Sequence, residues 1–353
     1  MTTIQQMDLA VPYEERHYRT KTGTTLVWPF LNLKPTKSGP ELFLDNNALN
    51  NVQWLADVPD NIRHGCVVNP FMAIQEQWFS NSVFREDPVA RIDSWTSYLA
   101  PYGIKFRPRY AGEQAALLRK NEKALRRQFS AIVPFVAIMR TLVSQRLSLD
   151  DALARLADLG QADIPRFSGA IALTALTVAL RKKQSFKLQG ETATAYSLLE
   201  SFLAFQPGKK DETDHMNVAY LRNRAGDLNV WLMLPILRQL GFSIGSHSAL
   251  ATGDKALHRV ILRTVPPVMM ESGTTSFTLA PKELPPEVEQ QVWSVLKQIE
   301  FRGQATPDLQ RARMRNIFDI AKAWTNDPRE QEALEEMFAE WWLPGHGLQI
   351  LPL

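Results

Sequence analysis

The sequence ELFLDNNAL, residues 41–49, is the clearest structural signal in this chain. Three consecutive apolar residues end at Asp45, and a short apolar run bounded by polar residues is typical of a strand buried inside a sheet. Two asparagines follow, and apolar residues then recur at helical spacing from Leu49 to Ala56. The stretch therefore predicts a strand, a turn and a helix, the repeating unit of an α/β fold.

The same alternation of strand and helix recurs further along the chain. The apolar run at residues 66–68 ends at Asn69-Pro70, and a proline at this place favours the start of a helix. The pattern predicts helices at FMAIQEQWF (71–79), DLNVWLMLPILRQLG (227–241) and from GDKALHRVILRTV (253–265), and a short strand or two within FSIGSHSALAT (242–252).

The segments between and after these stretches carry a helical pattern alone, which divides the chain into parts. The first 40 residues mix charge, Thr, Gly and Pro and read as a loop-rich extension. We therefore predict an N-terminal extension (1–40), an α/β domain in two pieces (41–84 and 206–284), a helical insertion (85–205) and a helical C-terminal region (285–353).

Composition is that of a globular protein and narrows the choice of function only a little. The chain has 353 residues, 45% hydrophobic and 22% charged, with a net charge of +3, so nucleic-acid contact would need a local basic patch. Its single cysteine, Cys66, excludes an internal disulfide and a multi-cysteine zinc site. We find neither a secretory signal nor a membrane anchor in the sequence, and expect a cytoplasmic protein.

Four carboxylates occupy similar places in the predicted pattern. In an open parallel α/β sheet the carboxyl ends of the strands share one edge, and ligands bind there. We therefore expect these four acids to converge: Asp45 closing the first strand, Glu76 in the helix after the second, Asp227 opening the long apolar helix, and Asp254 following the last strand.

A cleft that gathers carboxylates is stable only if cations neutralise their repulsion. Hard oxygen ligands of this kind suit Mg²⁺ or Mn²⁺. One or two such ions would activate water for in-line attack on a phosphodiester and stabilise the leaving oxygen. The sequence thus predicts metal-dependent phosphodiester hydrolysis, and it contains no P-loop, Rossmann glycine fingerprint, Gly-x-Ser-x-Gly or HExxH motif that would indicate another enzyme class.

These motifs resemble those of the PIN-like nucleases. LFLDNNAL is similar to their first strand, VVNPFMAIQEQW to their second strand and acidic helix, LRNRAGDLNVWLMLPILRQLG to the segment with their third acid, and SALATGDKALHRV to their last strand with its Thr-x-Asp. The four acids fall on the family's acidic positions, and Asn46 and Thr252 on its supporting polar positions. The resemblance covers about 40–85 and 217–265. Most members of the family are much shorter than this chain, in which roughly 150 residues separate the second acid from the third.

The resemblance implies an α/β/α sandwich with a central, mostly parallel sheet, and a Mg²⁺- or Mn²⁺-dependent endonuclease that acts on RNA. Many members are toxins, defence proteins or RNA-turnover enzymes, so an inhibitory protein partner would follow. Two alternatives stay open: a catalytically inactive PIN-like protein or RNA interaction module, and a structure-selective DNA nuclease of the same wider fold. The oligomeric state is left open by the sequence.

Each residue also has a simpler interpretation. Asp227 and Asp254 could be helix N-caps and Glu76 a solvated helix residue, whereas Asp45 at the end of a buried strand needs a partner. Asp214 is a candidate further ligand. Four basic residues beside the third and fourth acids could hold flanking phosphates or be ordinary surface charge: Arg222, Arg224, Lys255 and Arg259.

Overall fold

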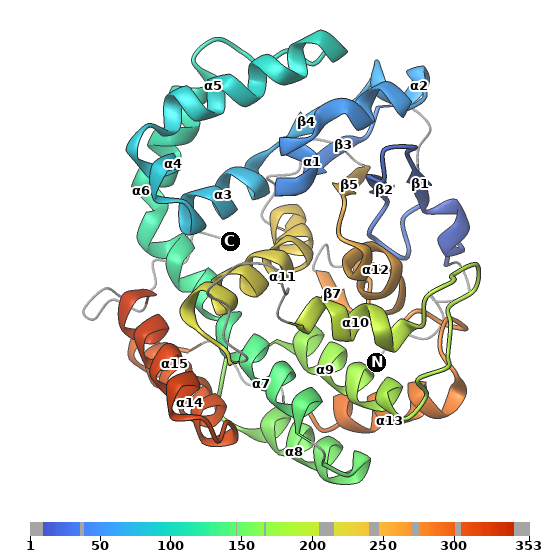
Figure 1. Ribbon diagram of the computed structural model, residues 1–353, viewed down its shortest axis with the longest axis vertical. Helices are drawn as coiled ribbons and strands as arrows, with labels where there is room; N and C mark the ends of the chain where they lie inside the picture. Colours follow the sequence, from blue (N-terminus) through green and yellow to red (C-terminus); the bar gives the residue numbers. More distant parts are fainter. Residues whose placement is uncertain are drawn as a thin grey trace. The chain divides into compact units, whose positions relative to one another are not determined.

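The chain folds into two compact units, each assembled from two separate segments (Figure 1). The first unit takes Met1–Glu122 and Asn229–Ala280, and the second takes Lys123–Leu228 and Pro281–Leu353. The computed structural model describes residues 10–35, 39–145, 147–165, 167–204, 215–239, 247–269, 275–300 and 305–341.

A five-stranded mixed sheet forms the centre of the first unit (Figure 1). Strand β3 runs parallel to both of its neighbours, β4 and β5, while β2 runs antiparallel to β5 and β1. The mixed α/β class expected from the sequence is therefore confirmed. The strands in spatial order are β1 (His17–Arg19), β2 (Thr25–Val27), β5 (Ser248–Thr252), β3 (Glu41–Leu44) and β4 (Val67–Asn69).

Both faces of this sheet are covered, which explains why β3 is buried at all four positions. Leu26, Ala251 and Leu44 are register partners across three strands and share one face. On that face they join a core cluster with Leu49 and Trp54, which follow β3 in the sequence. The apolar run at 42–44 is continuous because a strand covered on both faces buries every side chain.

Helices flank the sheet, and the helix expected after Asn69-Pro70 is confirmed as α3. An antiparallel pair, β6 (Pro267–Met269) and β7 (Thr275–Phe277), lies outside the main sheet. The helices in the described part of this unit are η2 (Tyr13–Glu15), α1 (Asn46–Asn50), η3 (Val52–Asp57), α2 (Asp60–Arg63), α3 (Phe71–Ser80), α4 (Ser82–Glu86), α5 (Pro88–Leu99), η4 (Ala100–Tyr102), η5 (Leu257–Ile261) and α12 (Leu262–Thr264), with parts of α6 (Tyr110–Ser130) and α11 (Val218–Gln239).

The unit boundaries differ from those expected. Residues 17–19 and 25–27, assigned to a loop-rich extension, form β1 and β2 and complete the sheet. Residues 85–122, assigned to the insertion, belong to the first unit, whereas the described residues 215–228, assigned to the α/β domain, belong to the second. Strands of three residues are too short to show a period-two pattern, so their place depends on the partner strand, which lies more than 200 residues away in the case of β2 and β5.

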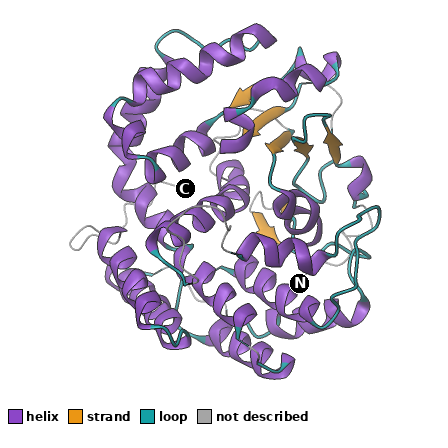
Figure 2. Ribbon diagram, viewed as in Figure 1, coloured by secondary structure: helices purple, strands orange, loops and turns teal. Residues whose placement is uncertain are grey.

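In the described part of the second unit, helices joined by loops are the only regular secondary structure (Figure 2). Helix α9 is buried at every position from Gly169 to Leu180 and packs against α7, α8, α10 and α13. The insertion and the C-terminal region expected as separate parts therefore share one core. Besides parts of α6 and α11 the helices are α7 (Val133–Ser144), α8 (Leu149–Gln161), α9 (Ser168–Arg181), α10 (Ala195–Leu203), α13 (Pro286–Leu296), α14 (Pro307–Trp324) and α15 (Pro328–Trp341).

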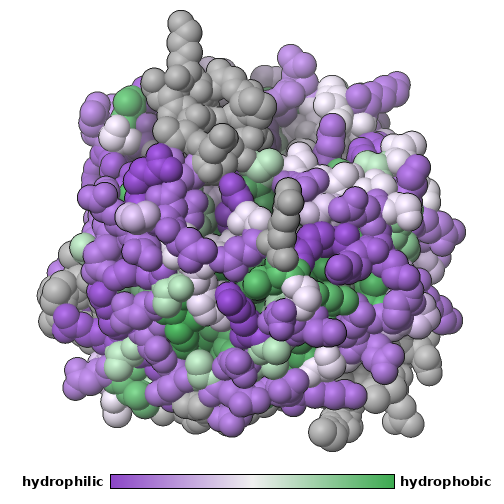
Figure 3. All heavy atoms as spheres, turned by 60° about the horizontal axis from the view of Figure 1, so that its bottom comes forward, coloured by the Kyte–Doolittle hydropathy of each residue, from purple (hydrophilic) through white to green (hydrophobic). Residues whose placement is uncertain are grey.

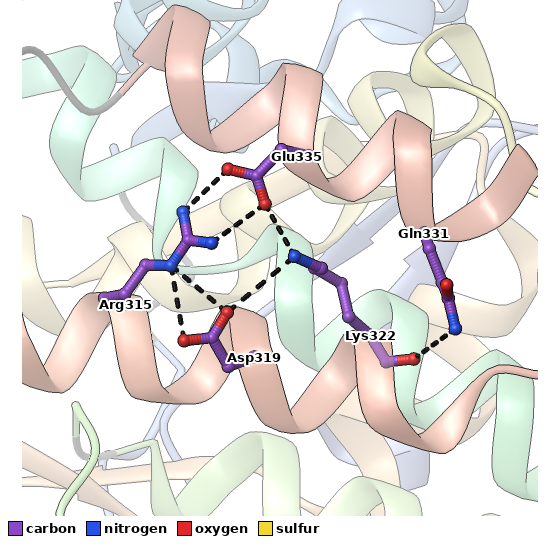
Figure 4. A network of polar contacts seen from close by, with 5 residues as sticks. All are labelled: Arg315, Asp319, Lys322, Gln331 and Glu335. Atoms are coloured by element: carbon purple, nitrogen blue, oxygen red, sulfur yellow. Dashed lines mark hydrogen bonds and ion pairs between the residues drawn. The ribbon is translucent and has the colours of Figure 1, made fainter. Parts of the chain in front are cut away.

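A network of charged side chains joins α14 to α15 in this unit (Figure 4). Arg315 donates to both carboxylate oxygens of Glu335 at 2.7 and 3.0 Å, and Lys322 donates to the same carboxylate at 2.7 Å. These hydrogen bonds lower the pKa of Glu335 to about 2. The Arg315 guanidinium also lies 4.7 Å from the ring centre of Phe338, so the network and the apolar packing hold the same two helices together.

The surface view in Figure 3 shows mostly hydrophilic side chains, with smaller apolar patches between them. Within the described ranges, no helix combines the length and the apolar character required to cross a membrane.

Candidate functional site

Asp45 and Asp254 are joined through the hydroxyl group of Thr252. Asp45 follows β3 and caps α1, because its Oδ1 accepts a hydrogen bond from the backbone N–H of Ala48 at 2.7 Å. Its Oδ2 accepts from Thr252 Oγ1 at 2.5 Å, and the same hydroxyl oxygen accepts from the backbone N–H of Asp254 at 3.0 Å. The carboxyl ends of two adjacent parallel strands, β3 and β5, are thereby linked, and two of the four acids expected to converge are joined here.

The carboxylate of Asp45 is held in an unfavourable environment for its charge. Only 5% of the residue is exposed, and burial raises the pKa of Asp45 from 3.8 to about 6. The hydrogen bonds from Thr252 and Ala48 oppose this rise, whereas the negative charge of Asp254 adds to it. A cation beside the two carboxylates would offset both the burial and the repulsion.

Asp254 also serves as a helix cap. Its Oδ1 accepts from the backbone N–H of Leu257 at 2.8 Å, at the start of the helical segment that leads into η5. The capping interpretation of Asp254 is therefore correct. A capping role does not exclude a role in the site, since Asp45 caps α1 and accepts the hydrogen bond from Thr252 at the same time.

Glu76 and Asn46 lie on two helices that are tied together. Asn46, the first residue of α1, accepts a hydrogen bond from Gln77 Nε2 of α3 at 2.7 Å. Glu76 is the preceding residue of α3 and is partly buried. The structure thus places Glu76 on α3, the helix after β4, as expected. Asn46 holds α3 to α1, the helix that Asp45 caps.

A buried amide pair on the other side of α3 was missed by the sequence analysis. Gln75 is fully buried and Asn229 is 2% exposed; Asn229 Nδ2 donates to Gln75 Oε1 at 3.3 Å. Gln75 Nε2 and Asn229 Oδ1 are buried without a hydrogen-bond partner. The signal was present, because Gln75 lies one helical turn from the buried residues Met72 and Phe79 and so falls on the apolar face.

Asp227 does not open a helix, contrary to expectation. Helix α11 starts at Val218, and Asn217 acts as its cap by accepting from the backbone N–H of Tyr220 at 2.8 Å. Asp227 lies in the middle of α11 within the second unit, where its Oδ2 accepts from Arg224 at 2.8 Å. Gly226 suggested a boundary, yet a glycine inside a helix is tolerated at a cost of about 1 kcal/mol.

The four basic candidates separate into two pairs. Arg222 forms an ion pair with Glu340, and Arg224 is buried, pairs with Asp227 and lies over the ring of Phe202. Both arginines therefore have partners inside the second unit. Lys255 is exposed and Arg259 partly buried, and both follow Asp254 in the first unit.

The acids of the first unit offer the kind of oxygen atoms that bind a divalent metal ion. Two carboxylates joined through a hydroxyl are hard oxygen ligands of the kind that Mg²⁺ and Mn²⁺ take, and the raised pKa of Asp45 is what a cation would lower. Among the described residues, no group of three or more His, Cys, Asp or Glu side chains is placed to hold a metal. Asp214, a candidate further ligand, lies outside the described residues.

Comparisons with models of protein families, with curated proteins and with solved structures find no match to this chain. Its function has to be inferred from the geometry of the site itself.

Proposed function

We propose that this protein is a metal-dependent endonuclease that hydrolyses phosphodiester bonds, with RNA as its substrate. The observation that carries the proposal is the Asp45–Thr252–Asp254 linkage at the carboxyl ends of two adjacent parallel strands. That edge is where α/β sheets bind their ligands. Glu76, on the helix that follows the neighbouring strand β4, supplies a third carboxylate to the same unit.

Each residue has a defined part in this proposal. Asp45 and Asp254, which Thr252 joins, would hold the metal. Glu76 is not placed with them in a group of three ligands, so its part in the site stays a prediction from the sequence. Mg²⁺ or Mn²⁺, when bound, supplies the Lewis acidity that activates water for attack on the phosphate. Thr252 fixes the rotamer of Asp45 through the 2.5 Å hydrogen bond, and the backbone N–H of Ala48 fixes the other oxygen of that carboxylate. Asp227, in the second unit, stays a prediction from the sequence.

The preference for RNA and an inhibitory protein partner come from the resemblance to PIN-like nucleases. Positive charge near the acids supports a polyanionic substrate, since Lys255 directly follows Asp254 and Arg259 lies five positions after it. Such residues contact the phosphates on either side of the scissile bond and position the strand without reading its sequence.

The test incubates the purified chain with end-labelled single-stranded RNA and DNA, in Mn²⁺ and in EDTA, beside Asp45→Asn and Asp254→Asn. Asp93→Asn, on the exposed surface of α5 in the same unit, is the matched control. We expect cleavage of RNA in Mn²⁺ that both site variants abolish and the control retains. Absence of cleavage of either substrate, or cleavage that survives both site variants, overturns the proposal.

One observation favours a second candidate, a PIN-like module that binds RNA or protein without cutting. Both oxygens of Asp45 already accept hydrogen bonds from the protein, as they would in a purely structural cap. The two functions differ in their response to metal. A nuclease gains thermal stability in Mn²⁺ through Asp45 and Asp254, whereas an inactive module keeps the same melting temperature with and without the ion.

A further inference from the structure

Strand β1 places a basic residue in the same transverse row of the sheet as the proposed site. Arg19 is the register partner of Thr25, and Thr25 is the register partner of Thr252. The hydroxyl group of Thr252 in turn donates a hydrogen bond to Asp45 at the end of β3. Residues directly opposite one another on neighbouring strands point to the same face of a sheet. Arg19, Thr25, Thr252 and Asp45 therefore follow one another across four strands on one face.

The neighbouring residue on β1 fixes which face this is. Tyr18 packs against the core cluster that contains Leu26 and Ala251, and its hydroxyl donates to the carbonyl oxygen of Asp57 at 2.8 Å. Successive side chains of a strand point to opposite faces. Arg19 is thus directed away from that core and is exposed at the edge strand.

The row lies at the edge of the sheet, because Arg19 and Thr252 are the last residues of β1 and β5 and Asp45 follows β3. Thr25 and Thr252 are fully buried, so a nucleic-acid strand would run along this edge and not over the row itself. Neighbouring strands are about 4.8 Å apart, so the backbone of Arg19 lies about 10 Å from that of Thr252 and about 14 Å from that of Asp45. A long arginine side chain at this range meets a strand of nucleic acid a short distance from the bond held at Asp45. A contact there orients the strand and leaves the chemistry to the acids.

Other basic residues lie in the same region of the first unit as Arg19. His258, in η5, lies within electrostatic range of Arg259 and Lys255 from its own helical segment and of Arg19 and His17 from β1, and these groups add to the effect of burial that lowers its pKa. The basic residues after Asp254 and those of β1 therefore lie in the same region of the first unit. Of these, Lys255 and Arg19 are exposed to solvent.

We propose that Arg19, Lys255 and Arg259 form a phosphate-binding strip, which holds the sugar–phosphate backbone of a single nucleic-acid strand on the β1 side of Asp45 and Asp254. The inference rests on the proposed function and names the path of its substrate. β1 and β2 lie outside the stretches that resemble PIN-like nucleases, so this part of the path is a property of this chain. Because the contacts are to phosphates, the strip weakens with salt and does not select bases.

The experiment measures binding apart from cleavage. The full chain is titrated into a fluorescein-labelled single-stranded RNA of mixed sequence, and into DNA of the same sequence, in EDTA, with fluorescence anisotropy read at several salt concentrations. Arg19→Ala is compared with Arg19→Lys and with Arg91→Ala, which removes an exposed arginine of α5 in the same unit. Figure 1 shows α5 well separated from β1 within that unit.

We expect Arg19→Ala to weaken binding on the order of fivefold at low salt and to reduce the slope of log affinity against log salt by about 0.7. Arg19→Lys restores the slope, Arg91→Ala changes neither quantity, and all variants keep the wild-type melting temperature. RNA and DNA respond alike if the backbone alone is held, and a larger effect on RNA assigns a 2′-hydroxyl contact to the strip.

Two results overturn the strip: wild-type affinity and salt slope in Arg19→Ala, or no binding of either strand by the wild type. The proposed function fails in a different way. If the wild type binds RNA in EDTA through Arg19 but does not cleave it in Mn²⁺, the strip stands and the nuclease activity does not.

Discussion

Thr252 Oγ1 donates a hydrogen bond of 2.5 Å to Asp45 Oδ2 and accepts one of 3.0 Å from the backbone N–H of Asp254. One hydroxyl group therefore couples two acids that are 209 positions apart along the sequence. Thr252 is fully buried, so neither hydrogen bond can be replaced by water without a structural change.

Replacing Thr252 tests whether this coupling supports activity. Thr252→Val keeps the shape of the side chain but removes both hydrogen bonds, so we expect a loss of about 1–3 kcal/mol in the free energy of unfolding. We also expect a drop of about 10- to 100-fold in cleavage rate, the usual effect of removing an outer support of a metal site. Thr252→Ser keeps the hydroxyl and should recover most of both losses. Equal values for Val and Ser would show that the hydroxyl group is not used.

Asp45 makes the metal-free protein less stable at neutral pH. Its pKa is raised from 3.8 to about 6 in the folded state, so the folded protein holds this proton more tightly than the unfolded chain. The free energy of unfolding therefore falls as pH rises through that window, by about 3 kcal/mol for this group. Asp45→Asn cannot ionise and should exceed the wild type in stability above pH 6, with the difference vanishing toward pH 4.

The measurement is urea unfolding in EDTA over a pH series, with Asp93→Asn as the exposed control. Mn²⁺ should raise the stability of the wild type and not that of Asp45→Asn, because the ion binds only the folded state. An Asp45→Asn curve parallel to that of the wild type at every pH would contradict the buried-charge interpretation.

His258 has the opposite pH dependence. Burial, together with the electrostatic effect of Arg259, Arg19, His17 and Lys255, lowers its pKa from 6.5 to about 3. The unfolded chain then binds the proton more readily, so the stability that neutral His258 contributes is complete above pH 6.5 and is lost as pH falls toward 3. The full effect is about 5 kcal/mol, which exceeds and opposes that of Asp45.

His258→Leu should therefore resist acid better than the wild type, with a lower midpoint of acid unfolding followed by far-UV circular dichroism. His64→Leu, at an exposed position directly after α2, provides the control and should leave the midpoint unchanged. If His258→Leu unfolds at the wild-type pH, the neutral buried histidine is not what limits acid stability.

The Gln75–Asn229 pair predicts a non-additive double substitution. Gln75→Met or Asn229→Leu alone leaves the remaining buried amide without its hydrogen-bond partner, which should lower the free energy of unfolding by about 1–3 kcal/mol. Replacing both removes every buried polar atom of the pair and should be more stable than either single variant, as a double-mutant cycle in urea would show. Costs that simply add would mean that the two amides do not depend on each other.

Much of the fold and of the candidate site could be predicted from local sequence. The run Leu42–Leu44, the proline before α3 and the Thr252–Asp254 motif each carry a signal within a few residues. Strand β3, helix α3 and the cap at Asp254 followed from these signals. The start of α11 did not, because Gly226-Asp227 resembles a helix boundary while packing carries the helix back to Val218.

The sequence by itself determined the types of the main elements and placed Asp45, Thr252 and Asp254 at their ends, because periodicity, capping and turn preferences act over one or two helical turns. Only the tertiary structure decided that β1 and β2 extend the sheet, that Arg19 falls in the row of Thr252 and Asp45, and that Asp227 belongs to the other unit. These depend on which distant segments bury one another, and a register across strands leaves no trace in the spacing of either strand alone.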